Sequence, residues 1–287
     1  MVRRLAFRTT RALLLFLAVG ALAACFRPRV ESSLPTGAQR FSAPPVYGKW
    51  WAMTAECSGA ANSLSTVQWF VVPGVSLFWR DGSVVNGYWS REGNAIVLAE
   101  GALEDGTVVR HEMLHALQDD GRHTRTFIER CAGVVGCMSA CVEAARRSAP
   151  VIAALPRASA SQMLIDVAID PLERGLTGSD GYFALTVSVR NPSRDSVVVE
   201  LPRSPESAAA SWFRFELSNG TVVIMNSTPA QASGSMVFAP GETRRAVFDI
   251  RLSQLLEGAA SLTPGTFAVR GGFGTEWSVS KSFALAQ

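Results

Sequence analysis

Val109-Arg110-His111-Glu112-Met113-Leu114-His115-Ala116-Leu117 is the stretch on which the organisation of this 287-residue chain depends. Its residue types predict a helix, in which His111 and His115 lie one turn apart on the same face, about 6 Å from each other. Two imidazoles at this spacing can bind one Zn²⁺, and Glu112, beside the first histidine, can reach a water molecule at the metal. The stretch therefore predicts a zinc site on a helix.

The flanking residues predict where this helix ends and what it packs against. We expect a helical core over residues 108–118, with Thr107 as its N-cap and Gly121 just beyond its C-terminus. An apolar stripe predicts that the helix packs on a sheet and turns the histidines to a different side; it consists of Val109, Met113 and Leu117.

The sequence His111-Glu112-Met113-Leu114-His115, on a helix predicted to follow several strands, resembles the HExxH motif of the zincin metallopeptidases. The resemblance implies that the histidines bind Zn²⁺ and that Glu112 acts as general base in the hydrolysis of a peptide bond. It also implies that an edge strand beside the helix, at residues 95–99, pairs with the substrate backbone. The candidates for stabilising the oxyanion are Tyr88, Arg110 and Arg122.

The third zinc ligand depends on which zincins the chain resembles. Metzincins place their third histidine six residues after the second, whereas His123 follows His115 by eight residues and Gln118 stands where their glycine would be. Gluzincins take a glutamate from a following helix, and the candidates of that type are Glu129 and Glu143. Small SprT- and WLM-like zincins have a short turn, a histidine and then an aromatic residue four positions on, which is the pattern of His123 and Phe127. We predict His123, and all three histidines of the chain then fall within 13 residues.

The N-terminus has the three parts of a secretory signal peptide. A basic segment is followed by the apolar run 12–19 and by Leu22-Ala23-Ala24-Cys25, which resembles the lipobox of bacterial lipoproteins. We expect residues 1–24 to be removed, Cys25 to be lipidated, and residues 25–46 to form a tether; the alternative is an ordinary signal cleaved near Ala24. The protein would then be exported and anchored by lipid to the cell envelope, at the outer membrane if the cell is Gram-negative.

The net charge of +3 comes from this N-terminal signal, whose four arginines account for four of the 27 basic residues. Without them 23 basic residues face 24 acidic ones. The charge therefore gives no reason to expect nucleic acid as a partner, and a peptide or protein substrate remains the expected one.

Four cysteines remain after the signal, and export to an oxidising compartment predicts that they form two disulfides. They are Cys57, Cys131, Cys137 and Cys141. Because three of them follow the histidines closely and one lies far upstream, at least one disulfide should tie the early part of the domain to the helix expected after the metal site. Zinc ligation by cysteine is the alternative, but the chain has no Cys-x-x-Cys pair.

The remaining pattern predicts two domains. Residues 47–148 should form a zincin-like domain, with strands before the histidine helix and a second helix starting at Thr124. Residues 149–160 are a linker rich in Ala, Pro and Ser, and residues 161–287 alternate as seven or so short strands, typical of a β-sandwich. Their turn residues resemble those of BsuPI-type immunoglobulin-like domains. The predicted fold class is an α+β zincin-like catalytic domain followed by an all-β immunoglobulin-like sandwich.

Two functions of different class follow. The first is a lipid-anchored, zinc-dependent endopeptidase with Glu112 as general base. The alternative is a non-catalytic cell-envelope lipoprotein, in which the zinc is structural and the sandwich binds a partner. The two differ in whether one coordination position of the metal is open or closed.

Overall fold

The computed structural model describes most of the chain after the N-terminal segment. The described residues are 34–137, 155–170, 173–174, 181–200, 213–218, 223–227, 235–251 and 265–285. Cys25, Cys141 and Glu143 lie outside them, as do the predicted signal peptide and most of the predicted linker. Contacts join Pro35–Gln287 into one compact unit. None of the described helices combines the length and apolar character needed to span a membrane.

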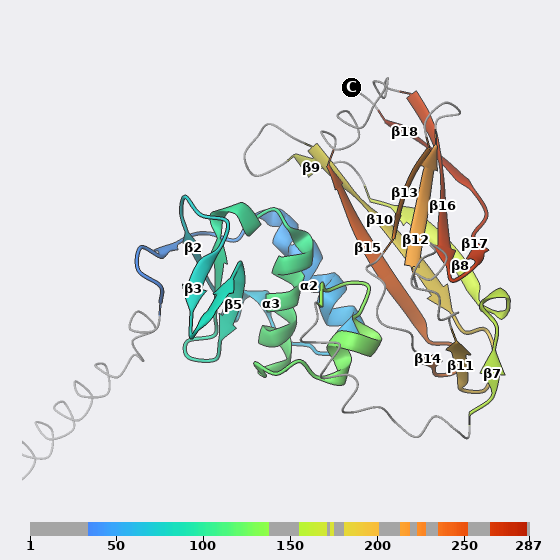
Figure 1. The fold of residues 1–287 in the computed structure, drawn as a ribbon, viewed down its shortest axis with the longest axis horizontal. Coiled ribbons are helices and arrows are strands. Elements are labelled where there is room, and N and C mark those ends of the chain that lie inside the picture. The colour runs from blue at the N-terminus through green and yellow to red at the C-terminus, as the bar shows by residue number, and fades with distance from the viewer. Residues whose placement is uncertain are drawn as a thin grey trace, which may run out of the picture. The chain divides into compact units, whose positions relative to one another are not determined.

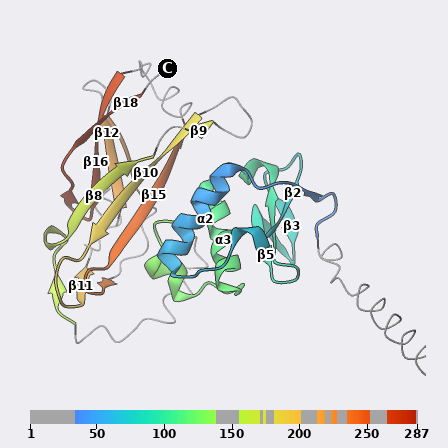
Figure 2. The ribbon, with the colours of Figure 1, turned by 180° about the vertical axis from the view of Figure 1, so that it is seen from behind.

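A four-stranded sheet and two α-helices precede the histidine-rich turn (Figure 1, Figure 2). The sheet has the order β1 (Gln39–Arg40), β2 (Gln68–Val72), β6 (Ala95–Ala99) and β5 (Gly87–Ser90), in which only β2 and β6 run parallel. The helices are α2 (Pro45–Ser58) and α3 (Gly106–Gln118). A separate hairpin consists of β3 (Phe78–Arg80) and β4 (Ser83–Val85), and single helical turns are η2 (Leu64–Thr66), η3 (Glu100–Ala102) and η4 (Thr126–Arg130).

The predicted apolar stripe of the histidine helix does pack on this sheet. Val109, Met113 and Leu117 of α3 are buried in one cluster with Ile96 and Leu98 of β6. Every side chain of β6 is buried, as its uninterrupted apolar sequence indicates for a central strand. The stripe prediction is confirmed, and the histidines are left on another side of the helix.

The edge strand of the sheet beside α3 is β5. We expected residues 95–99 to be the edge strand, and that prediction is wrong because β6 pairs with β2 on one side and with β5 on the other. No strand within the described part of the chain pairs with the outer side of β5. The apolar run that identifies a strand does not tell whether it lies at the centre or at the edge.

The ends of α3 differ from the prediction by a few residues. Asp105 is the N-cap, since its carboxylate accepts hydrogen bonds from the backbone N–H groups of residues 107 and 108. Helix α3 ends with the C-cap Asp119, which has a φ of 50° in the left-handed region, and so it ends before the predicted Gly121. The second helix predicted from Thr124 is limited among the described residues to the single wide turn η4.

The C-terminal strands form three further sheets around one hydrophobic core. The first contains β8 (Leu164–Ile169), β9 (Glu173–Arg174), β10 (Gly181–Arg190) and β15 (Thr243–Arg251). The second contains β7 (Arg157–Ala158), β11 (Val197–Glu200) and β14 (Ser235–Phe238), with the turn η5 (Ala160–Gln162) between β7 and β8. The third contains β12 (Phe213–Ser218), β13 (Val223–Ser227), β16 (Gly265–Phe273), β17 (Glu276–Trp277) and β18 (Lys281–Leu285). We call these strands the C-terminal sheets.

The predicted fold class is therefore wrong. The described residues are mostly strand, distributed over several small sheets, with two α-helices, and they contain no clear α+β zincin-like domain followed by an immunoglobulin-like sandwich. Alternating apolar residues identified many of the strands, but the grouping of strands into sheets depends on long-range pairing that the pattern does not encode. The predicted boundaries at residues 148 and 160 stay predictions.

Candidate metal centre

Two histidines of α3 are each held by a backbone carbonyl. The Nδ1 atom of His111 lies 2.6 Å from the carbonyl oxygen of Gly136, and the Nδ1 atom of His115 lies 2.7 Å from that of Asp120. A carbonyl oxygen only accepts hydrogen bonds, so each Nδ1 carries the proton. This leaves the Nε2 atom of both rings as the free electron-pair donor, which is how histidine ligands of metals are usually oriented.

His123 completes the group. Its Nε2 atom lies 3.0 Å from the Nε2 atom of His111, and the three rings form a nearly equilateral triangle with centroid separations of 4.9, 5.0 and 5.1 Å. The potential ligand atoms of His111, His115 and His123 all lie within 4.8 Å of one another. Nitrogens bound at 2.0–2.1 Å to one tetrahedral Zn²⁺ are about 3.3 Å apart, so the arrangement is close to that of a three-histidine site.

The ring of Phe127 packs against all three imidazoles. Its ring centroid lies 5.0 Å from that of His111, 4.6 Å from that of His115 and 5.2 Å from that of His123, and its side chain is fully buried. The turn η4 places this ring, because residues 126–130 bring Phe127 back toward α3 four residues after His123. An apolar wall on this side restricts water to the other side of the group.

The environment keeps the imidazoles neutral. Burial, together with the neighbouring His115, lowers the pKa of His111 to about 3, and burial lowers the pKa of His115 to about 4. Burial also lowers the pKa of His123. A neutral imidazole is the form that binds a metal ion, and three of them suit Zn²⁺ and other first-row transition metals. The donor set therefore fits a transition-metal ion, and the geometry alone does not select zinc among them.

Glu112 is buried between α3 and the edge strand β5. Burial raises the pKa of its carboxyl to about 8, although a hydrogen bond from the backbone N–H of Trp89 and the positive charge of Arg80 act in the opposite direction. Its side chain is only 6% exposed. A carboxyl with such a pKa, on the helix that carries two potential metal ligands, is suited to exchanging a proton near neutral pH.

The hydrogen-bond pattern of β5 shows why Trp89 reaches Glu112. The N–H of Ala99 donates to the carbonyl of Asn86 at 2.8 Å, so in this antiparallel pair residues 86, 88 and 90 exchange hydrogen bonds with β6. The N–H and C=O groups of Gly87 and Trp89 then point to the open side of the strand. Glu112 therefore lies at the outer edge of the sheet.

Of the remaining candidates from the sequence, those among the described residues do not join the three histidines. The carboxylate of Glu129 binds Arg125 at 2.6 Å, and Glu143 lies outside the described residues. Arg110 is completely buried and points to Val134 and Asp249, and Arg122 is 86% exposed and pairs with Asp120.

Tyr88, the third oxyanion candidate, belongs to β5 and packs against the β3–β4 hairpin. The guanidinium carbon of Arg80 lies 3.3 Å from the centroid of its ring, and Phe78 contacts the same ring edge-on. Burial raises the pKa of Tyr88. Arg80 is a cation that acts on Glu112, and sequence reasoning missed it because no motif connects the hairpin residue Arg80 with the histidine helix.

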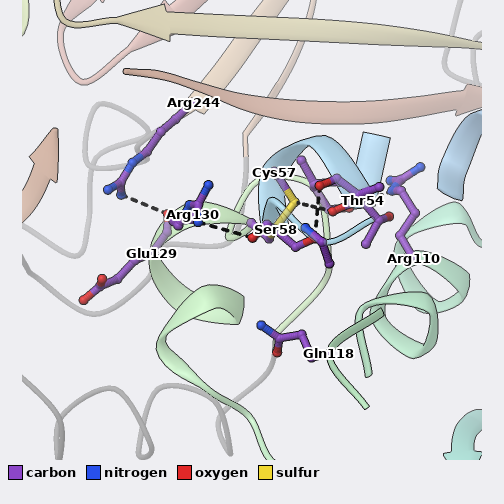
Figure 3. Close-up of a disulfide and its surroundings, with 12 residues drawn as sticks. Thr54, Cys57, Ser58, Arg110, Gln118, Glu129, Arg130 and Arg244 are labelled. Carbon is purple, nitrogen blue, oxygen red and sulfur yellow. Dashed lines mark hydrogen bonds between the residues drawn. A yellow bond between two sulfur atoms is a disulfide. The ribbon is translucent and has the colours of Figure 1, made fainter. Parts of the chain in front are cut away.

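A disulfide fixes the turn η4 to helix α2. Cys57 and Cys131, which are 74 positions apart in sequence, are bonded (Figure 3). Around this bond Arg130 donates to the carbonyl of Ser58 at 3.2 Å, and Arg244 donates to the carbonyl of Glu129 at 2.9 Å (Figure 3). The prediction that a disulfide ties the early part of the domain to the segment after the histidines is confirmed. Cys137 is also disulfide-bonded, and Cys141 lies outside the described residues.

No family model matches this sequence, and no curated protein does. Among solved structures, the chain is similar over 43% of its length to a β-glucosidase involved in saponin metabolism from intestinal bacteria, with 12% identity, a TM-score of 0.27 and 16% of that chain covered. A β-glucosidase from Erythrobacter marinus gives 12% identity, a TM-score of 0.27 and coverage of 43% and 15%. The ApaA protein from Bordetella pertussis gives 15% identity, a TM-score of 0.25 and coverage of 43% and 88%. Similarities this weak carry no argument about function.

Proposed function

We propose that the protein is a zinc-dependent peptidase. The observation that carries the proposal is the convergence of His111, His115 and His123, together with the buried carboxyl of Glu112 on the helix that carries two of them. Structural zinc sites are closed by four protein ligands, whereas catalytic sites have three and an open position. Within the described part of the chain the group has three members, which supports a catalytic role over a structural one.

The proposed chemistry assigns proton transfer to Glu112. When bound, Zn²⁺ would act as a Lewis acid on water and on the substrate carbonyl. A cation at the three nitrogens favours the ionised form of Glu112, which can then accept a proton from water and deliver it to the leaving nitrogen. The N–H of Trp89 keeps the carboxylate in place during this exchange.

The substrate would bind as an added strand at β5. Gly87 and Trp89 direct backbone groups to the open side of this strand, and Glu112 lies at the same edge. An extended peptide that pairs with Gly87 and with the carbonyl of Trp89, whose N–H stays bonded to Glu112, would run along the edge at which Glu112 lies. The open edge thus supports a polypeptide substrate, which offers backbone groups at the spacing of a strand.

The proposal includes export and attachment of lipid at Cys25. It rests on the basic segment, the apolar run and the Leu22-Ala23-Ala24-Cys25 sequence. Mass spectrometry of the protein from bacterial membranes tests it directly, since a diacylglyceryl group on Cys25 adds a mass that an unmodified cysteine lacks. Cleavage that leaves an unmodified Cys25, or no cleavage, would contradict it.

Hydrolysis of an unfolded protein substrate tests the enzymatic proposal. We expect wild-type protein with one equivalent of Zn²⁺ to cleave it, and Glu112→Gln to bind zinc but to lose at least 100-fold in rate. Glu129→Gln is the matched control, because Glu129 pairs with Arg125 at the surface and should leave the rate unchanged. Full cleavage by zinc-loaded Glu112→Gln would remove Glu112 from the mechanism.

A further inference from the structure

A buried ion pair links the metal centre to the C-terminal sheets. Arg110 precedes the ligand His111 on α3, its side chain has no exposed surface, and its Nη2 atom lies 2.8 Å from Oδ2 of Asp249 on β15. Its Nε atom donates to the carbonyl of Val134 at 2.6 Å. One arginine therefore holds α3, strand β15 and the segment after η4 together.

That segment, residues 131–137, also holds His111. The N–H of Gly136 donates to the carbonyl of Thr107 at 3.4 Å, and the carbonyl of Gly136 accepts the hydrogen bond from Nδ1 of His111. On its other side the segment lies against β15: the N–H of Val247 donates to the carbonyl of Gly133 at 2.8 Å. The carbonyl that orients His111 is thus supported by β15 from behind.

The close approach at this junction requires glycine at two positions. A Cβ atom on Gly106 would lie 2.5 Å from Oδ2 of Asp249 and 2.6 Å from Nη1 of Arg110. A Cβ atom on Gly133 would lie 2.5 Å from the backbone oxygen of Arg245. A side chain at Gly106 would collide with the ion pair, and one at Gly133 would collide with the backbone of β15.

The ion pair itself is poorly suited to stabilising the fold. Among the described residues, Nη1 of Arg110 and Oδ1 of Asp249 are buried without a hydrogen-bond partner. Removing two charges from water is costly, and a buried pair with unsatisfied atoms is often no more stable than two apolar side chains of similar size. What such a pair does supply is a fixed geometry, here of Arg110 and of the carbonyl of Val134 that it binds.

We propose that Asp249 is a positioning residue of the metal centre. It holds Arg110 against the 131–137 segment, so that the carbonyl of Gly136 keeps the proton of His111 on Nδ1 and its Nε2 atom directed at the metal. The C-terminal sheets then complete the metal site. This inference rests on the metal centre of the proposed function and is independent of which bond the protein cleaves.

Zinc affinity and the protonation of His111 test the proposal in the full chain. We expect Asp249→Asn to weaken Zn²⁺ binding by about 10- to 100-fold, the usual effect of losing a group that orients a ligand. In the metal-free protein, long-range ¹H–¹⁵N NMR spectra should show His111 as the Nδ1–H tautomer in wild type and as a mixture in the variant. Asp166→Asn, which breaks the surface pair of Asp166 with Lys281, is the control and should change neither property.

A double variant separates positioning from stability. The double variant Arg110→Met/Asp249→Leu removes both charges. We therefore expect its midpoint of unfolding to equal or exceed that of wild type. Zinc binding should stay weak, because the bond to Val134 is lost. If Asp249→Asn or the double variant binds Zn²⁺ as tightly as wild type, Asp249 is not a positioning residue, although the metal site itself stands. A wild-type protein that binds no zinc overturns both.

Discussion

Glu112→Gln should make the metal-free protein more stable at alkaline pH. Burial raises the pKa of Glu112 to about 8 from its usual 4.5. The unfolded chain therefore loses this proton near pH 4.5, whereas the folded protein keeps it until about pH 8. The contribution of the protonated carboxyl to stability is complete below pH 4.5 and is lost as the pH rises to 8.

The size of the effect follows from the shift. Each pH unit between the two pKa values lowers the free energy of unfolding by about 1.4 kcal/mol. Wild type therefore loses about 5 kcal/mol of stability between pH 4.5 and pH 8. Glutamine keeps the shape and an oxygen for the N–H of Trp89, but it has no proton to lose. The free energy of unfolding of the variant minus that of wild type should be near zero at pH 4.5 and rise with pH.

Urea denaturation between pH 5 and 8, with EDTA present and the disulfides oxidised, measures this difference. The histidines titrate in both proteins, so their contribution cancels. Glu129→Gln is the control, because an exposed ion pair contributes at most about 1 kcal/mol and should show no such trend. A difference in the free energy of unfolding between Glu112→Gln and wild type that does not grow with pH would refute the claim that the buried carboxyl of Glu112 keeps its proton up to about pH 8.

Three further changes test the surroundings of the site. His123→Ala should abolish stoichiometric zinc binding, measured by metal analysis after dialysis, whereas Glu129→Ala should retain one equivalent; the reverse pattern would make Glu129 the third ligand. Phe127→Ala removes the buried ring under the histidines and should lower the free energy of unfolding by about 3–5 kcal/mol in urea titrations. A loss below about 1 kcal/mol would show that the ring is not packed there. Replacing both Cys57 and Cys131 by serine opens a link across 74 residues and should cost about 4 kcal/mol in the same titration, with no change expected if the disulfide does not form.

Local sequence patterns predicted the parts of the site that depend on local structure. The apolar stripe of Val109, Met113 and Leu117 identified α3 and its buried face, because helix periodicity requires only neighbouring residues. The resemblance of the turn after α3 to that of SprT- and WLM-like zincins brought His123 and Phe127 into the candidate site. Cysteine positions on either side of the histidines likewise indicated a disulfide across them, and the structure shows that Cys57 bonds to Cys131.

Features that depend on distant segments escaped prediction. β6 and β5 both read as strands, but only pairing with β2 shows which of them is the edge. The carbonyls that orient the histidines belong to Gly136 and Asp120, and a backbone carbonyl leaves no residue-specific signal. Asp249 is 139 residues from Arg110 in sequence, so their pairing is a property of the folded chain. The same reason explains the error in the fold class.

X-ray absorption at the zinc edge of the purified, zinc-loaded protein tests the central proposal most directly. We predict one Zn²⁺ per chain, bound by three imidazole nitrogens at about 2.0–2.1 Å and by one oxygen atom in the fourth position. Single replacement of His111, His115 or His123 by alanine should reduce the number of imidazoles by one or abolish binding. Sulfur ligands at about 2.3 Å, or a spectrum unchanged by the three replacements, would contradict it.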